Sequence, residues 1–185
     1  MKHILISCTI LLVTLSACNN EGESSVGTTG KKEADEAGLT VNEREDKTGT
    51  FSFDGKSVTG KVETQYFGDR EKGNYSVLCQ HNEGGNENPN FELLQVIFLN
   101  EKEATGNPAP KIYDGGSVLP MTEPEPGIIS VTLSGVGSNL DNKEFTGSEK
   151  STGSIAVKNR TIEITDLSLY NSNGEKRIVN AKIPF

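Results

Sequence analysis

Hydrophobic and polar residues alternate with a period of two along much of the chain after residue 47. The first such segment is Thr50–Phe53, which is followed by the dipeptide Asp54-Gly55 and by a second alternating segment, Ser57–Phe67. Alternation predicts strands with one buried face, and an Asp-Gly turn between two of them is typical of a β-hairpin. The pattern therefore predicts an antiparallel hairpin at the start of the folded region.

Three further strands are predicted in the middle of the chain. Tyr75, Val77 and Cys79 lie on one face of a third strand, and Gly127–Ser134 alternates again. Between them, Phe91–Leu99 is apolar on both faces, which fits a strand buried on both sides or a short buried helix. Its β-branched and aromatic content favours the strand.

The C-terminal segment Ser154–Phe185 has the pattern of a three-stranded meander. Its turns are predicted at Asn159-Arg160 and at Asn173-Gly174, because these residues tolerate the backbone angles of tight hairpin turns. We therefore expect three consecutive antiparallel strands at the end of the chain.

The middle strand of this meander changes phase. Ile162 and Ile164 share one parity, whereas Leu167 and Leu169 share the other. A regular strand cannot place all four side chains on one face unless an extra residue is inserted. The sequence therefore predicts a β-bulge near Thr165-Asp166.

The segment Glu101–Gly127 is the least regular part of this region and holds five prolines. Proline is excluded from central strands and from helix interiors, so we expect a long surface loop with one short edge strand around Ile112-Tyr113.

No amphipathic helix is predicted after the N-terminal segment. About eight short strands separated by Gly- and Asn-rich turns predict an all-β fold: a single antiparallel β-sandwich, immunoglobulin-like or similar, with a small β-barrel as the second choice.

The N-terminal segment has a different pattern. Lys2 and His3 precede an apolar run, Ile4–Leu15, which has the length of a signal-peptide core and is too short to span a membrane. The run ends in Leu15-Ser16-Ala17-Cys18, which resembles the lipobox of bacterial lipoproteins: a branched aliphatic residue, two small residues and a cysteine.

The resemblance implies that cleavage removes residues 1–17 and that Cys18 becomes the lipidated first residue of the mature protein. Several acyl chains on one residue would hold the protein stably on a membrane. Residues 18–46 are polar and acidic and predict a flexible tether, and residues 47–185 predict one all-β domain. The resemblance implies a location in the bacterial envelope, at the outer membrane, and leaves the periplasmic and the surface face as alternatives. Glu21 and Glu23 loosely match the acidic residues that accompany surface export in lipoproteins of the Bacteroidetes type.

The chain carries a net charge of −8, from 18 basic and 26 acidic residues. Removal of residues 1–17 takes away one lysine and no acid, so the mature chain would carry 17 basic residues and a net charge of −9. Nucleic-acid binding requires a basic surface that displaces counterions, and the sequence shows no basic stripe. The composition therefore argues against a nucleic-acid partner.

Chemistry-bearing residues are sparse in the mature chain. Cys79 and His81 are the only candidates for a nucleophile or a metal site, and a buried cysteine beside an ordinary histidine is the favoured interpretation, since further zinc ligands are not suitably spaced. No cofactor is predicted.

The segments His81–Asn90 and Ser138–Glu144 contain many oxygen atoms that could bind calcium. Neither segment has the spacing of a known calcium loop, so solvated turns are the favoured interpretation.

Sugar-binding surfaces use aromatic rings, and the chain has four tyrosines and no tryptophan. Tyr66 and Tyr75 fall in the phase of the core, which leaves Tyr113 and Tyr170, so the sequence gives little support for carbohydrate binding. The first functional hypothesis is a non-catalytic, membrane-anchored domain that binds a ligand, a polymer or a partner protein at the cell envelope, with an unknown protein or a polysaccharide as the expected partner. The alternative is a structural or accessory subunit of a surface appendage that assembles by strand addition. An enzyme is the third hypothesis.

Overall fold

The structure is a computed structural model that describes residues 47–68, 73–83, 90–106, 109–113, 119, 126–136 and 140–185. Cys18, the predicted signal peptide and the predicted tether lie outside these residues. Within them the chain forms ten strands and one short helix, in this order: β1 (Thr48–Phe53), β2 (Lys56–Phe67), β3 (Asn74–Asn82), β4 (Phe91–Phe98), α1 (Glu101–Gly106), β5 (Lys111–Ile112), β6 (Ile128–Val136), β7 (Glu144–Thr146), β8 (Ser154–Lys158), β9 (Thr161–Tyr170) and β10 (Lys176–Pro184).

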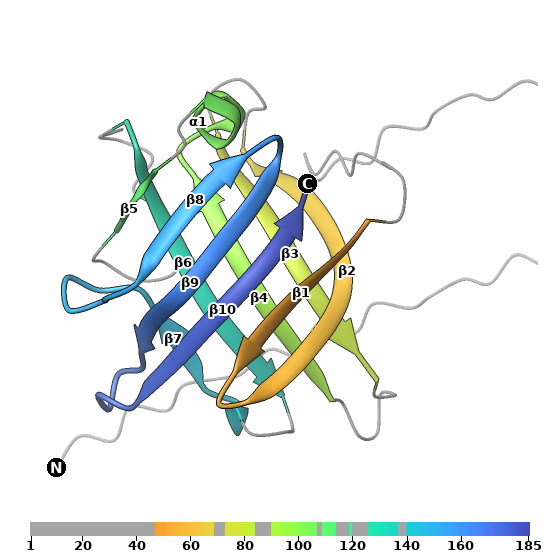
Figure 1. The fold of residues 1–185 in the computed structure, drawn as a ribbon, viewed down its shortest axis with the longest axis vertical. Coiled ribbons are helices and arrows are strands. Elements are labelled where there is room, and N and C mark those ends of the chain that lie inside the picture. The colour runs from red at the N-terminus through yellow and green to blue at the C-terminus, as the bar shows by residue number, and fades with distance from the viewer. Residues whose placement is uncertain are drawn as a thin grey trace, which may run out of the picture. The chain divides into compact units, whose positions relative to one another are not determined.

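Eight of the strands close into a ring, as Figure 1 shows. Strands β1, β2, β3, β4, β6, β7, β9 and β10 are neighbours in chain order, each antiparallel to the next, and β10 pairs back with β1. Strand β5 pairs in parallel with β6, and β8 pairs with β9. The fold is therefore an up-and-down antiparallel β-barrel with two short additional strands.

The all-β prediction is confirmed, but the β-sandwich is wrong, and the second choice, a barrel, is observed. Alternation specifies which side chains face inward, and it does not specify whether the first and last strands pair. Here they pair over four residues, from Thr50 opposite Lys182 to Phe53 opposite Val179. That pairing joins the two ends of the sheet.

The predicted hairpin turns and the bulge are confirmed. Asp54, Asn159 and Arg160 have φ values of 48°, 50° and 56°, as two-residue hairpin turns require. In the β9–β10 pair, Leu167 faces Val179 and Ile164 faces Ala181, so two residues, Thr165 and Asp166, oppose Asn180 alone. The bulge is held by Asn180, whose Oδ1 accepts from the Asp166 amide at 2.9 Å and whose Nδ2 donates to the Asp166 carboxylate at 3.2 Å.

The barrel interior is packed with apolar side chains contributed by every strand of the ring. One buried core residue per strand, in ring order, is Phe53, Val62, Val77, Leu94, Val131, Phe145, Leu169 and Val179. Burial of such side chains stabilises a fold by about 1.5–3 kcal/mol each. An eight-stranded barrel has an interior just wide enough for side chains to fill, so binding surfaces are expected at its ends or on its outer wall.

Two ends of the barrel can be distinguished (Figure 1). The helix end carries α1 and the β8–β9 turn. There Arg160 donates to the Phe185 carbonyl at 3.0 Å and to the Tyr75 hydroxyl at 3.3 Å, and Glu101 of α1 accepts from the Tyr66 hydroxyl. The hairpin end carries the β1–β2, β3–β4, β6–β7 and β9–β10 connections. The helix end is thus covered by a short helix that a polar network fixes in place.

Helix α1 and strand β7 were not predicted. The helix has six residues and one buried side chain, Ala104, so it has no apolar periodicity to detect. Its start is nevertheless encoded, because Asn100 Oδ1 accepts from the Glu103 amide at 2.9 Å as an N-cap. The short edge strand predicted around Ile112 is confirmed as β5.

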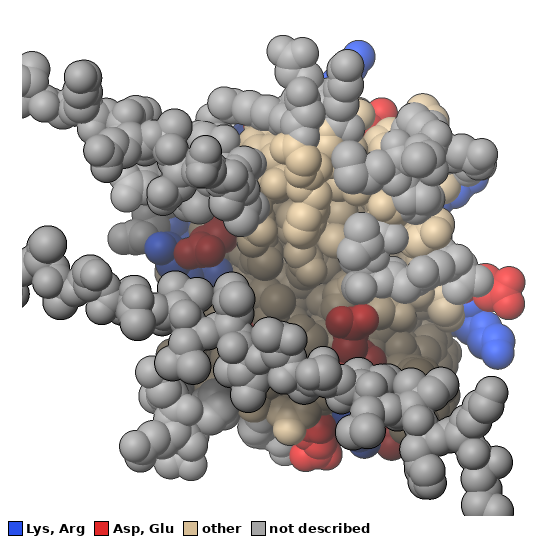
Figure 2. Space-filling model, turned by 180° about the vertical axis from the view of Figure 1, so that it is seen from behind, with Lys and Arg blue, Asp and Glu red and all other residues tan. Residues whose placement is uncertain are grey.

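The outer wall is chemically asymmetric. Strands β2, β9 and β10 carry charged pairs on the outside, such as Lys61 with Glu63 and Lys182 with Glu163. Figure 2 shows the opposite wall, which is largely free of charged side chains over its centre. The outward positions of β3, β4 and β6 there include Ser76, Leu78, Gln95, Ile97, Ser130 and Thr132.

Gly60 allows β2 to bend from its pairing with β1 to its pairing with β3. A Cβ atom on Gly60 would lie 2.5 Å from the carbonyl oxygen of Gln80, which belongs to the backbone of β3 and cannot turn away. We expect Gly60→Ala to lower the free energy of unfolding by about 1–3 kcal/mol, the range of overpacking. The measurement is urea unfolding of the purified protein.

Gly106→Ala is the matched control, because a Cβ at Gly106 meets nothing within 4 Å. It should leave stability unchanged or raise it by up to about 1 kcal/mol, since alanine favours helices over glycine. Equal destabilisation by both substitutions would contradict the role assigned to Gly60.

Candidate binding groove

Cys79 lies on the inward face of β3 and is fully buried. Its Sγ lies 3.8 Å from the carbonyl oxygen of Gly60, and burial raises the pKa of the thiol to about 11. The thiol is therefore protonated near neutral pH, whereas nucleophilic and metal-binding cysteines act as thiolates. This environment favours the core interpretation of Cys79.

His81 follows Cys79 on β3 but lies near the surface, with Nε2 2.9 Å from Glu83 Oε1. Its cross-strand neighbour is Glu92 of β4. Among the described residues, no three His, Cys, Asp or Glu side chains form a group that could hold a metal ion. The structure thus does not bring Cys79 and His81 together with further ligands of that kind.

The two Asn- and Glu-rich segments are only partly described, since residues 84–89 and 137–139 lie outside the described part. In the second segment, Asp141 and Asn142 have φ values of 48° and 59°. This is the left-handed turn geometry for which Asn and Asp are favoured, and it fits the interpretation of a turn.

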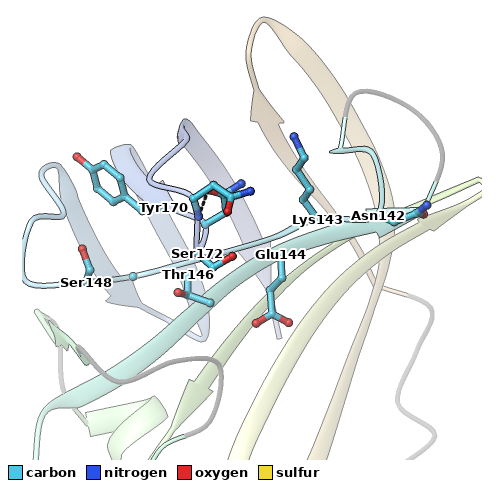
Figure 3. A pocket seen from close by; sticks show the side chains of 10 residues that line it. Asn142, Lys143, Glu144, Thr146, Ser148, Tyr170 and Ser172 are labelled. Atoms are coloured by element: carbon cyan, nitrogen blue, oxygen red, sulfur yellow. Dashed lines mark hydrogen bonds between the residues drawn. The ribbon is translucent and has the colours of Figure 1, made fainter.

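A surface groove of about 660 Å³ lies at the seam between β7 and β9. The seam exists because β7 pairs with β9 at one position only, Thr146 opposite Tyr170. Figure 3 shows Tyr170 and Ser148 toward one end of the groove and Asn142 and Lys143 toward the other. The groove is lined by Asn142, Lys143, Glu144, Thr146, Gly147, Ser148, Tyr170, Asn171, Ser172 and Asn173.

One wall of the groove is the β9–β10 turn, and its backbone is fixed by Asn171. The Asn171 Oδ1 accepts from the amides of Asn173 at 3.0 Å and Glu175 at 2.9 Å, and the Asn171 carbonyl accepts from Gly174 at 3.0 Å. A ligand would therefore meet a preformed turn and would lose less entropy in ordering it.

The opposite wall is tied to this turn through Lys143. Its Nζ donates to both carboxylate oxygens of Glu175, at 2.8 and 3.1 Å, and Asn171 Nδ2 donates to the same carboxylate at 2.7 Å. The hydrogen bond from Lys143 holds the pKa of Glu175 below its usual value. The charges of Lys143 and Glu175 are thereby paired with each other at the rim.

Tyr170 supplies the aromatic surface of the groove. The prediction that Tyr66 and Tyr75 belong to the core is confirmed, since both are buried with ring centroids 5.1 Å apart. Tyr170 is half-buried at the end of β9, as is Tyr113 after β5, outside the groove. Hydroxyl and amide groups beside one aromatic ring suit a ligand that carries many hydroxyl groups.

The groove was not predicted, because its residues come from segments about 30 positions apart in the sequence. The only sequence indication was the unassigned Tyr170 next to the Asn-rich turn at residues 171–174. A second groove, of about 610 Å³, lies over β1, β2 and β3 and is lined by Lys47, Lys61, Glu63 and His81 among others. No Phe or Tyr side chain is among its lining residues. We therefore regard the β7–β9 groove as the better candidate.

Comparison of the chain with protein-family models, curated proteins and solved structures gives no match. Within the described ranges, no helix has the length and apolar character needed to cross a membrane. Function must therefore be argued from the chemistry of the sites themselves.

Burial of Cys79 predicts an unreactive thiol. In a chain that begins at Lys47, Cys79 is the only cysteine, and we expect a chromogenic disulfide reagent at pH 8 to react with it only after denaturation. The thiol ionises at about 9 when exposed and at about 11 in the fold. Stability contributed by the neutral thiol is therefore complete below pH 9 and is lost as pH rises toward 11.

The alkaline part is checked by thermal unfolding between pH 8 and 11. A Cys79→Ala variant, measured in parallel, should lose less stability over that interval than the parent chain. Rapid labelling of the native protein at pH 8 would show that the thiol is accessible and would contradict the buried assignment.

Proposed function

We propose that this protein is a lipid-anchored envelope protein whose barrel binds a neutral, hydroxyl-rich polymer such as a polysaccharide, without catalysis. The observation that carries the proposal is the β7–β9 groove, in which Tyr170 stands beside a turn fixed by Asn171. Aromatic rings stack on the apolar faces of sugars, while amides and hydroxyls exchange hydrogen bonds with sugar hydroxyls.

Charge supports a neutral ligand over an anionic one. The chain has a net charge of −8, and the lysine that lines the groove, Lys143, is already paired with Glu175. An anionic polymer would meet overall repulsion and no free cation from the lining residues. The groove is open to solvent, so a chain that extends beyond it can still be accommodated.

The anchor is proposed from the sequence. Leu15-Ser16-Ala17-Cys18 would supply the lipid at Cys18, and the polar residues 18–46 would tether the barrel at the outer membrane. A tether of this length has a typical reach of roughly 30 Å, which is sufficient for a domain to contact polymers near the membrane surface.

The other two hypotheses have less support. The ring of eight strands has no free edge, and β8, with five residues and Lys158 at its end, is the longest described strand outside the ring. Short edges that end in lysine are typical of proteins that avoid strand addition. An enzyme that used Cys79 as a nucleophile would need a thiolate in a position where burial raises the thiol pKa to about 11.

Tyr170→Ala tests the groove. Stacking of a ring contributes about 0.5–1.5 kcal/mol, so we expect the substitution to weaken binding of neutral polysaccharides about two- to tenfold. The measurement is retardation of the native protein in electrophoresis through gels that contain a series of soluble neutral polysaccharides. Tyr113→Ala, which changes a half-buried tyrosine outside the groove, is the control and should bind like the parent.

Two outcomes would contradict the assignment of the groove. One is that no neutral polysaccharide in the series retards the parent protein. The other is that Tyr113→Ala weakens binding as much as Tyr170→Ala does.

Cys18→Ser tests the anchor. The parent protein, expressed in a bacterial host, should partition into the detergent phase and show the added mass of its acyl groups on Cys18. The variant should keep residues 1–17 and lack that mass, because the thiol that accepts the lipid is gone. Acylation that persists in the variant would rule out the lipobox interpretation.

A further inference from the structure

Four polar residues occupy neighbouring positions of the paired backbone at the hairpin end of β3 and β4. His81 is directly opposite Glu92 in the strand pair. Two residues further on, the Glu83 amide donates to the Asn90 carbonyl at 2.9 Å, so these two residues are also opposite each other. Residues two apart on a strand share a face, and the four side chains therefore project from the same face.

This face is the one that points into the barrel. Glu92 has the same parity as Leu94 and Val96, which belong to the core, and its side chain is 0% exposed. Lys56 of β2 reaches across the hairpin end and forms an ion pair with the Oε1 atom of Glu92. The Glu92 carboxylate thus points into the barrel from β4, and only its Oε1 atom is paired with a positive charge.

The second oxygen of the Glu92 carboxylate, Oε2, has no ion-pair or hydrogen-bond partner among the described residues. Glu92 Oε2 is buried and has no hydrogen-bond partner among the described residues, and the same holds for Asn90 Oδ1 on the same face of β4. A buried polar atom without a partner costs about 1–3 kcal/mol, and more where it is charged. Two such atoms in one place indicate a group that the polypeptide does not itself provide.

The chemistry of these atoms restricts that group. Both are acceptors, so the missing group is a cation or a hydrogen-bond donor and cannot be an anion. The charges of Glu83, Glu92 and Lys56 sum to −1. Carboxylate and amide oxygens are the ligands of hard cations, whereas zinc prefers nitrogen and sulfur.

Calcium fits these constraints better than magnesium. Calcium accepts irregular arrangements of carboxylate, amide and carbonyl oxygens, whereas magnesium requires a near-octahedral shell and retains its waters. The rim is accessible, because the Glu83 side chain is 64% exposed; its carboxylate lies 2.9 Å from His81 Nε2 and would have to leave His81 to reach the ion. A small ion can therefore reach the buried oxygens after a rotation of the rim side chains.

We propose that Asn90 and Glu92, with Glu83 at the rim, form a calcium-binding site at the hairpin end of the barrel. The Lys56 ammonium and the ion compete for the Glu92 carboxylate, so the Lys56–Glu92 pair is the calcium-free state of the site. The site is separate from the β7–β9 groove and does not depend on the polysaccharide proposal. Its affinity is expected in the range of extracellular calcium modules, a Kd of about 10⁻⁴–10⁻³ M.

The experiment is calorimetric titration of the full chain, purified in detergent and freed of metal with a chelator, using CaCl₂ and, separately, MgCl₂ and ZnCl₂. We expect saturable binding of calcium and at least tenfold weaker binding of magnesium. Thermal unfolding recorded with and without about 10 mM CaCl₂, at least tenfold above the expected Kd, should show a rise in Tm of a few degrees.

Four variants assign the site. Glu92→Gln removes the buried charge and should abolish calcium binding. Asn90→Ala leaves every charge in place and should weaken it at least fivefold, which keeps the test valid if Glu92→Gln fails to fold. Lys56→Met removes the competitor and should tighten binding severalfold. Glu63→Gln, which neutralises an exposed carboxylate on β2, is the control and should bind like the parent.

The proposal is overturned if the parent chain shows neither calcium heat nor a calcium-dependent rise in Tm, since the two oxygens would then be met by water. It is equally overturned if zinc binds in preference to calcium, or if Asn90→Ala binds calcium like the parent. Weaker binding by Lys56→Met would contradict the competition and place Lys56 in support of the site.

Discussion

The pairing of β1 with β10 is the constraint on which the rest of the structure depends. It joins the first and last strands of the ring through four residue pairs, from Thr50 with Lys182 to Phe53 with Val179. Without it the same strands would form an open sheet with two long edges and a half-exposed apolar face. With it, one face of every strand is buried, and the first and last strands of the ring have partners.

Closure also dictates where function can reside. Eight strands enclose a space that side chains fill, and the core residues of this barrel are close to fully buried. A ligand is therefore expected where the regular pairing is interrupted. The seam at which Thr146 and Tyr170 form the single β7–β9 pair is such an interruption. The Glu92 site differs, because strand pairing continues through it and only a side-chain oxygen lacks a partner. The groove therefore follows from a departure in the ladder, and the Glu92 site follows from an unpartnered acid inside a complete one.

The sequence predicted the local elements better than their assembly. The Asp54-Gly55 turn and the bulge at Thr165-Asp166 were predictable because each depends on a few neighbouring residues and on parity. Barrel closure was not, because it depends on a contact between the two ends of the domain. The same applies to the groove, which joins β7 to the β9–β10 turn. Glu92 could have been noticed, because it has the parity of Leu94 in a run that is otherwise apolar on that face.

The two ends of the barrel differ in how completely their polar groups are satisfied. At the helix end, Glu101 is contacted by the Tyr66 hydroxyl and lies 3.6 Å from Arg160, whose guanidinium also covers the Phe185 ring at 5.0 Å. Such a network fixes a cover in one position.

At the hairpin end, Arg177 lies over the Phe145 ring at 4.7 Å and pairs with Asp54 at 2.7 Å, but the carboxylate of Glu92 is only half compensated. A protein that required only a closed barrel could fill the Glu92 position with leucine, as the neighbouring Leu94 does, and gain stability. The buried acid, paired with Lys56 on one oxygen only, is the arrangement that the proposed exchange of Lys56 for an ion requires.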